Sequence, residues 1–246
     1  MNNINTIQAS VILPTYNEAG NIIKLIESIR YQLSSKRINN EVIVVDDDSP
    51  DKTGLLAQKY FSKFPGVRVI VRKKNKGLAL AIRAGLEASV GKVVVVMDTD
   101  FNHEPELVPR LVEKCEKYDI AVGSRFVRKG GMANKRREFM SRIYNMFLVR
   151  PIIGSPVHDN LSGFFAMKRS KLERLNFDYI FWGYGDYFIR LIYFAKKQGN
   201  VFAELPSFYR DREYGNSKSN FVNMFKTYLT SSINLRLGKV NEKERV

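Results

Sequence analysis

The sequence predicts an α/β protein in which helices flank a mostly parallel central sheet, with an amphipathic helical extension at its C-terminal end. Apolar, β-branched runs alternate with segments of helical periodicity through the first half of the chain. The connections between these segments are short, which favours right-handed β-α-β crossovers and helices on both faces of the sheet. Acidic residues follow three of the apolar runs. Such sheets bind ligands beyond the carboxyl ends of their strands, so these acids predict a binding crevice.

Four strands with intervening helices are expected before residue 100. The strands are "ASVILP" (9–14), "EVIVVD" (41–46), "VRVIVRK" (67–73) and "GKVVVVMD" (91–98), and the helices lie at 19–35, 54–64 and 76–89. In the first helix Ile22, Leu25, Ile26 and Ile29 recur with helical spacing. The continuous valine run at 93–96 is typical of a strand that is buried on both faces.

The pattern changes after residue 120. "DIAVGSRF" (119–126) predicts a fifth strand, and a basic, glycine-containing loop at 127–138 leads into a helix at 139–151. A strand–helix unit at 162–175, a helix at 183–199 and an edge strand that begins near residue 200 follow. The tail is amphipathic and basic, so it either packs on the domain or lies in a membrane interface. We expect a domain at residues 1–218 and a separate tail at 219–246.

Composition restricts the class of protein. The chain has 246 residues, of which 44% are hydrophobic, enough for one large domain with a substantial core. One cysteine, Cys115, excludes a disulfide framework and fits the reducing cytoplasm. No window approaches the roughly 18 to 20 apolar residues of a membrane span, and the N-terminus has no signal-peptide pattern. These features predict a soluble or peripheral protein of the cytoplasm.

The net charge of +15 is concentrated in the second half. Residues 1–122 carry 17 Lys and Arg against 15 Asp and Glu, whereas residues 123–246 carry 23 against 10. An anionic partner is therefore expected. Charge alone does not choose among a nucleic acid, a phosphorylated ligand and an anionic membrane surface.

Two carboxylates, Asp98 and Asp100, follow the valine run one residue apart. Carboxylates held close repel each other unless a cation lies between them. Oxygen ligands suit Mg²⁺ or Mn²⁺, and Mg²⁺ completes its shell with water and substrate phosphate oxygens. A divalent metal site is one interpretation, and a solvated Asp-x-Asp turn is the other.

Two other strand ends carry residues suited to a nucleoside. Tyr16 offers a flat face for a base, Glu18 can accept hydrogen bonds from a ribose or base, and Pro14 fixes the exit of the strand. Asp46 and Asp47 can accept from the imino and amino groups of guanine or uracil. Helix capping is the alternative role for polar residues at these positions.

Seven short stretches together resemble family 2 glycosyltransferases. They are "VILPTYNE", "VIVVDDDSPDKT", "GLALAIRAGL", "MDTDFNHEPE", "VGSRF", "DNLSGFF" and "DREYGNSK", and they span nearly residues 8–220. Each is weak alone, but their order and spacing are specific, and the branch that they resemble most is the dolichyl- or polyprenyl-phosphate mannose synthases. The resemblance implies a Rossmann-like GT-A fold.

The resemblance also implies roles for particular residues. Asp98 and Asp100 would hold the metal on the diphosphate of a nucleotide sugar, with Asn102 completing the metal shell. Apart from the resemblance, the place of His103 near these acids makes it a further metal ligand, a neighbour of the ligands or a turn residue. The nucleoside would contact Pro14, Tyr16, Glu18, Val44, Asp46 and Thr99. The phosphates would be bound by Arg125, Arg137, Arg212 and Lys218, and Asp159 would shape the acceptor side.

The activity implied is an inverting transfer of a hexose, mannose from GDP-mannose first, onto a polyprenyl phosphate at the cytoplasmic face of a membrane. An ionised phosphate needs no general base. In "GYGDYFIRL", however, Asp186 occupies a position where other family 2 enzymes carry a base, so a UDP-sugar donor and a hydroxyl acceptor form an alternative. A basic nucleic-acid-binding module is a second alternative, although acidic strand ends would repel a phosphate backbone.

Overall fold

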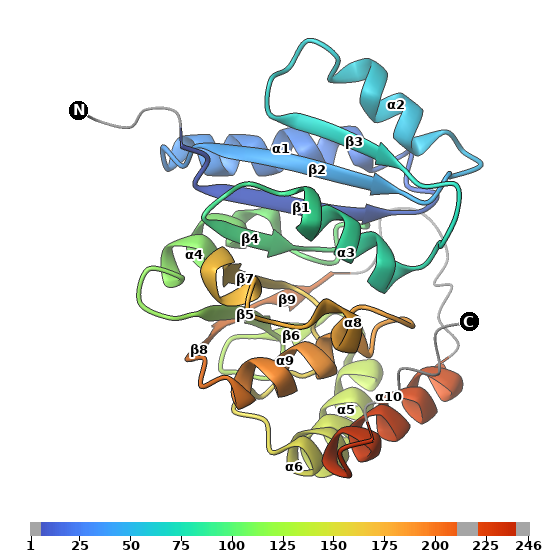
Figure 1. Cartoon of the computed structure of the whole chain (residues 1–246), viewed down its shortest axis with the longest axis vertical. Helices are drawn as coiled ribbons and strands as arrows, with labels where there is room; N and C mark the ends of the chain where they lie inside the picture. The colour runs from blue at the N-terminus through green and yellow to red at the C-terminus, as the bar shows by residue number, and fades with distance from the viewer. Residues whose placement is uncertain (1–5, 211–220, 240–246) are drawn as a thin grey trace.

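A seven-stranded sheet runs through the computed structural model, which describes residues 6–210 and 221–239. The strand order is β3-β2-β1-β4-β7-β5-β8 (Figure 1). The strands are β1 (Ala9–Thr15), β2 (Asn40–Asp46), β3 (Val67–Val71), β4 (Val93–Val96), β5 (Ile120–Ser124), β7 (Phe165–Lys168) and β8 (Phe202–Pro206). Only β7 runs antiparallel to its neighbours, β4 and β5. The mostly parallel sheet is therefore confirmed, and β8 is its edge strand as expected.

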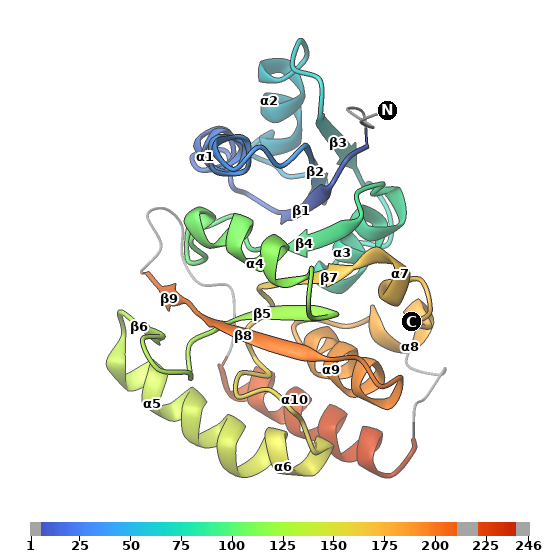
Figure 2. The same ribbon diagram turned by 90° about the vertical axis from the view of Figure 1, so that its left-hand side faces the viewer.

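Helices lie on both faces of this sheet and beyond its β8 edge (Figures 1 and 2). They are α1 (Ile22–Ser35), α2 (Thr53–Tyr60), α3 (Leu78–Ala88), η1 (Pro105–Leu107), α4 (Val108–Lys114), α5 (Lys135–Tyr144), η2 (Asn145–Val149), α6 (Arg150–Ile153), α7 (Arg169–Leu172), α8 (Phe177–Ile180), α9 (Tyr187–Lys197) and α10 (Phe221–Arg236). A small second sheet pairs β6 (Gly131–Met132) with β9 (Phe208–Tyr209). No helix in the two described ranges is both long enough and apolar enough to span a bilayer.

The structure begins α5 at Lys135, four residues before the helix that the sequence predicts at 139–151. The Asn134 side chain accepts a hydrogen bond of 2.9 Å from the backbone N–H of Arg137. Such a cap satisfies a donor that the first turn of a helix leaves unpaired. Helical structure then continues from α5 through the π-helical turn η2 into α6.

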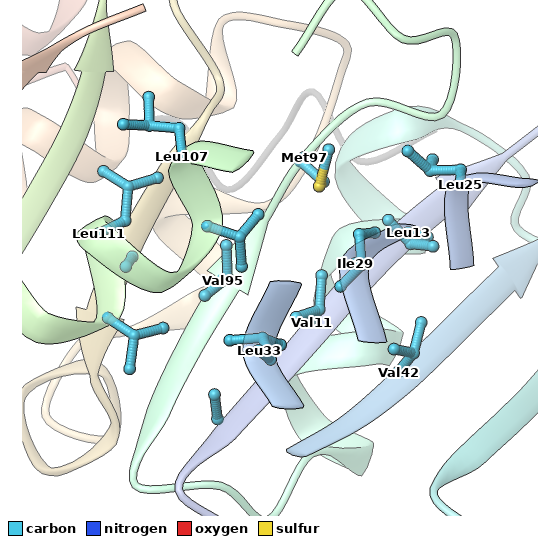
Figure 3. Close-up of a cluster of buried hydrophobic side chains, with 14 of the residues drawn as sticks. Val11, Leu13, Leu25, Ile29, Leu33, Val42, Val95, Met97, Leu107 and Leu111 are labelled. Carbon is cyan, nitrogen blue, oxygen red and sulfur yellow. The ribbon is translucent and has the colours of Figure 1, made fainter. Parts of the chain in front are cut away.

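Apolar side chains form a separate core on each face of the sheet. On one face α1, α2 and α4 pack on the strands, and Figure 3 shows Leu25 and Ile29 of this cluster facing Val11 and Leu13. On the other face α3 and α9 pack on the opposite sides of the same strands. Figure 2 shows α1 and α4 on one side of the sheet and α3 on the other.

The described part of the C-terminal tail forms α10, which packs on the domain. Its residues Tyr228 and Leu235 are buried with Val149, Ile153 and Ile189 in a third apolar cluster. Figures 1 and 2 both place α10 beside α6. Of the two alternatives for this segment, packing therefore holds for the residues that the structure describes.

The strand order places a crevice at the carboxyl ends of β1 and β4. Strand β1 pairs with β2 on one side and with β4 on the other. The chain adds β2 and β3 toward one edge of the sheet and then returns to add β4 on the other side of β1, so the strand order changes direction between β1 and β4. Ligands of open α/β sheets bind at such a switch point. Residues that follow β1 and β4 are thus the first place to look for a site.

Helix α3 lies so close to the sheet at Gly85 that little room remains for a larger side chain. A Cβ atom at this position would lie 2.4 Å from Cγ2 of Ile12 and 3.1 Å from Cγ2 of Val45. Alanine gains about 1 kcal/mol over glycine in a helix, but overpacking a core costs about 1–3 kcal/mol. We therefore expect Gly85→Ala to lower the free energy of unfolding, measured by urea denaturation, by about 1 kcal/mol. A gain in stability would show that helix and sheet pack less closely.

Candidate active site

A cavity of about 660 Å³ opens at the carboxyl ends of β1 and β4. Its lining comes from the end of β1, the turn after β2, the start of α3, the loop after β4, the loop before α9 and from α10. These residues are Pro14, Thr15, Tyr16, Glu18, Asp47, Lys76, Gly77, Leu78, Ala81, Asp98, Thr99, Asp100, Tyr184, Asn223, Met224, Thr227 and Tyr228. The cavity is therefore lined by polar and acidic residues from the strand ends that the sequence predicts as a site.

The loop after β4 brings both predicted metal ligands to this cavity. Asp98 is about half exposed, with 47% of its side chain accessible, whereas Asp100 is buried at 4%. The Asp100 carboxylate accepts hydrogen bonds from the backbone N–H of Asn102 at 3.1 Å and from its side-chain amide at 2.8 Å. The three residues that the resemblance assigns to the metal therefore form one local group.

Asp98, Asp100 and Asn102 offer two carboxylates and an amide oxygen, which is a suitable set for Mg²⁺ or Mn²⁺. Among the described residues, no group of three or more His, Cys, Asp and Glu side chains could hold a metal alone. Within the two described ranges, the cavity lining carries four carboxylates and a single basic side chain, Lys76. A diphosphate would be repelled there unless a cation accompanied it.

The end of β1 supplies Pro14, Tyr16 and Glu18 to the cavity. The Tyr16 side chain is 44% exposed, so its ring face is accessible. The Thr99 hydroxyl donates to the carbonyl oxygen of Pro14 at 3.3 Å and links the ends of β1 and β4. Glu18 accepts a hydrogen bond of 2.7 Å from the amide of Asn21.

Asp47 is the acid of the second strand end that faces the cavity. One carboxylate oxygen accepts from the backbone N–H of Gly77 at 2.6 Å, and the other lies 3.4 Å from Nε of Arg72. This second oxygen is buried and has no hydrogen-bond partner in the described part of the chain. Burial raises the pKa of Asp47, although Gly77 and Arg72 oppose the shift. An acceptor of this kind suits a nucleobase N–H.

Val44 and Asp46 are not brought to the cavity. Val44 is fully buried in the core against α1. Asp46 is 2% exposed, and its carboxylate accepts from both the hydroxyl and the backbone N–H of Ser49. Asp46 therefore holds the turn after β2, whereas Asp47 lines the cavity and pairs with Arg72.

Arg125 forms a buried ion pair with Asp159. Its Nε and Nη2 each donate to the Asp159 carboxylate at 2.7 Å, and its backbone N–H donates to the same group at 3.0 Å. Burial alone would lower the pKa of Arg125, but Asp159 reverses the effect and raises it. Arg125 is not among the residues that line the cavity.

The other predicted phosphate-binding residues are distributed differently. Arg137 lies in the first turn of α5, partly buried. Arg212 and Lys218 fall outside the described residues.

Asp186 forms a second buried ion pair, with Arg190 one helical turn later. Both side chains are 1% exposed. Arg190 also donates to the carbonyl oxygen of Ile180 at 2.9 Å and to the Ser231 hydroxyl at 3.2 Å, and its guanidinium lies 3.7 Å from the centre of the Trp182 ring. Asp186 does not line the cavity. This cluster fixes the loop before α9 against α10.

Two parts of the lining were not predicted as site residues. Lys76, Gly77 and Leu78 lie at the start of α3, and a glycine at φ +133° precedes the helix. The N-terminus of a helix favours anions, so the lysine and glycine before this helix were a weak signal in the sequence. Tyr184 and the four residues of α10 had no such signal.

Two curated relatives have sequences similar to this chain, which also matches the family described as glycosyl transferase family 2 over residues 10–175. A dolichol-phosphate mannosyltransferase from Pyrococcus furiosus is 42% identical over 171 residues, which are 68% of this chain and 47% of that protein. The chain thus spans about half the length of that relative. A polyprenol monophosphomannose synthase from Mycolicibacterium smegmatis is 33% identical over 221 residues, 87% of this chain and 82% of that protein.

Solved structures with a similar fold include glucosyl-3-phosphoglycerate synthase from Mycobacterium tuberculosis. Its complex with Mg²⁺ and UDP has a TM-score of 0.68 and 24% identity, covering 94% of this chain and 79% of that one. Its complex with Mn²⁺ and UDP-glucose gives the same values. At this identity the likeness shows the fold, and it confirms the GT-A expectation.

The buried pair of Asp186 and Arg190 gives a stability prediction. Asp186→Asn leaves the Arg190 charge enclosed without its partner, so we expect a loss of about 3–5 kcal/mol in the free energy of unfolding by urea denaturation. Glu87→Gln is the matched control, because Arg83 and Glu87 form an exposed pair at the same helical spacing, worth about 0.5 kcal/mol or less. Equal losses in the two variants would contradict the enclosure of Asp186.

Proposed function

Since the chain belongs to glycosyl transferase family 2, we propose that it is a metal-dependent, inverting enzyme that transfers mannose from GDP-mannose to a polyprenyl phosphate at a membrane surface. The observation that carries the proposal is the cavity at β1 and β4, which joins the Asp98–Asp100 loop to Tyr16 and Asp47. The names of the two curated relatives support mannose transfer to a lipid phosphate. A nucleic-acid-binding role is disfavoured by the acids that line the cavity.

The donor would lie with its nucleoside toward β1 and β2. The Asp47 carboxylate at the cavity wall can accept from a nucleobase N–H, and the exposed ring of Tyr16 can stack on the base. Pro14 and Thr99 shape the same wall, and Glu18 stands near it. Guanine and uracil both present an N–H to such an acceptor, so the choice of GDP over UDP needs a donor comparison.

Asp98, Asp100 and Asn102 are the residues that would hold Mg²⁺ or Mn²⁺. Bound there, the metal would neutralise charge on the departing nucleoside diphosphate. The structural neighbours that bind Mg²⁺ or Mn²⁺ with UDP support a divalent metal in this fold. Lys76 adds a cation to the cavity lining.

The acceptor phosphate needs no general base, because it is ionised near neutral pH. Its oxygen would attack the anomeric carbon as the bond to the diphosphate breaks, and this single displacement inverts that centre. Asp186 is enclosed with Arg190 and does not line the cavity, which supports a phosphate rather than a hydroxyl acceptor. Arg137, Arg212 and Lys218 remain proposed phosphate contacts, and Arg125 would act from beneath the site.

An apolar helix face suits contact with the membrane. Six large apolar side chains of α5 and η2 are exposed by 38–65%: Phe139, Met140, Ile143, Met146, Phe147 and Leu148. We call this set the apolar helix face. Arg136 and Arg142 on the same helix are also exposed. Apolar side chains flanked by cations fit the interface of an anionic bilayer, so this face rather than α10 is our proposed membrane contact.

A donor and metal assay tests the activity. With Mn²⁺, a short polyprenyl phosphate and labelled sugars, we expect labelled lipid and released nucleoside diphosphate from GDP-mannose but not from UDP-glucose, and none in EDTA. Asp98→Asn and Asp100→Asn should each lower kcat/KM by about 10²–10³, the cost typical of a lost electrostatic contact to the transition state.

Asp178→Asn is the control for that assay, because Asp178 is an exposed acid outside the cavity that pairs with Arg83. Its kcat/KM should equal that of the unchanged protein. Turnover that persists in EDTA, or that requires a sugar hydroxyl in place of the lipid phosphate, would reject the proposed reaction.

Vesicle binding tests the apolar helix face. Phe139→Ser with Phe147→Ser removes two exposed rings without changing charge, and burial of a phenylalanine contributes about 1.5–3 kcal/mol. We expect the double variant to bind vesicles of anionic phospholipid at least about a hundredfold more weakly, as measured by co-sedimentation. Tyr60→Ser with Phe64→Ser is the matched control, since these rings are each 48% exposed near α2. Equal losses of vesicle binding in the two double variants would contradict the proposal, because exposed aromatic rings anywhere on the surface would then suffice for binding.

A further inference from the structure

His103 lies directly beneath the loop that carries Asp98 and Asp100. It is fully buried. Its ring stacks on Phe164 at 4.7 Å between centroids and meets the edge of Tyr209 at the same distance. A histidine held in this way on two rings cannot turn freely, so the direction of its two nitrogen atoms is fixed.

The hydrogen bonds define its tautomer. Nδ1 accepts a hydrogen bond of 2.9 Å from the backbone N–H of Asp98 and therefore carries no proton. An imidazole ring with one unprotonated nitrogen is neutral. The one proton of the neutral ring then lies on Nε2.

Among the residues that the structure describes, that Nε2–H makes no hydrogen bond of good geometry, although the backbone of Ser162 lies near it. It lies 3.8 Å from a carboxylate oxygen of Asp98, just beyond hydrogen-bond distance. A buried donor without an acceptor costs about 1–3 kcal/mol. A shift of the Asp98 side chain by less than about 1 Å would satisfy it.

We propose that His103 is a positioning residue that orients the Asp98 carboxylate for the metal and the donor: Nδ1 fixes the backbone of Asp98, and Nε2–H binds one of its carboxylate oxygens. The inference rests on the proposed function, because it treats Asp98 as a metal ligand. Partners that orient a ligand in this way typically change metal affinity by 10- to 100-fold when removed.

The same ring connects the donor side to the buried pair beneath the site. Tyr209, which contacts His103, lies with its ring 4.6 Å from the Arg125 guanidinium. Arg125 in turn is held by Asp159. A chain of contacts therefore runs from the Asp98 loop through His103 and Tyr209 to the Arg125–Asp159 pair.

Two substitutions separate the two nitrogen atoms. The side-chain oxygen of asparagine can replace Nδ1 as acceptor, whereas the amide nitrogen of glutamine can replace Nε2 as donor. Mn²⁺ binding to the full chain with GDP present would be measured by electron paramagnetic resonance, beside the melting temperature. We expect His103→Asn to bind Mn²⁺ about tenfold more weakly. His103→Gln should keep the affinity of the unchanged protein but melt at a lower temperature.

Tyr209→Phe is the matched control. It removes the hydroxyl that donates to the carbonyl oxygen of Ser162 at 2.8 Å but keeps the ring against His103. Its Mn²⁺ affinity should be unchanged.

The outcomes distinguish this inference from the function on which it rests. An unchanged protein that binds no Mn²⁺ with GDP would overturn both. Normal Mn²⁺ binding by the unchanged protein and by folded His103→Asn would overturn the role of His103 alone. Should His103→Asn not fold, His103→Gln decides, because a tenfold loss of affinity in that variant would also overturn the role.

Discussion

Burial of β4 on both faces is the constraint on which the rest of the site depends. Val94, Val95 and Val96 are at most 1% exposed, and Met97 continues the packing in the cluster of Figure 3. The chain therefore leaves the sheet only after Met97, and Asp98 emerges at the rim where β1 also ends. Apolar packing thus holds carboxylates together in a place where their repulsion favours a bound cation.

Beneath this rim, the second half of the chain uses two arginines internally. Arg125 pairs with Asp159 and Arg190 with Asp186, all of them at most 5% exposed. Enclosed charges of this kind demand partners, and removing one partner costs far more than an exposed pair contributes. The positive charge of this half is therefore not all directed at a ligand. Part of it fixes the loops around the cavity.

The sequence could predict what depends on local periodicity and strand ends. The valine run before Asp98 located both a buried strand and the acids at its end, and the helical spacing of Ile22 to Ile29 located α1. Pairings over long separations left no local signal. The antiparallel insertion of β7 between β4 and β5 is one example, and the partner of Arg125, 34 residues later, is another. The contribution of α10 to the cavity depends on packing between distant helices, which amphipathic spacing alone does not specify.

Asn145 joins the apolar helix face to the loop that holds Arg125. It is 1% exposed at the start of the π-helical turn η2, a rare element that is frequently found at functional sites. Its side chain donates to the carbonyl oxygen of His158 and accepts from the backbone and side chain of Asn160. Asp159 lies between these two residues, so three hydrogen bonds of one side chain fix the face relative to the Arg125 pair. If the face rests on a bilayer, the depth at which a lipid phosphate enters the site is set by this rigid connection and not by a flexible segment.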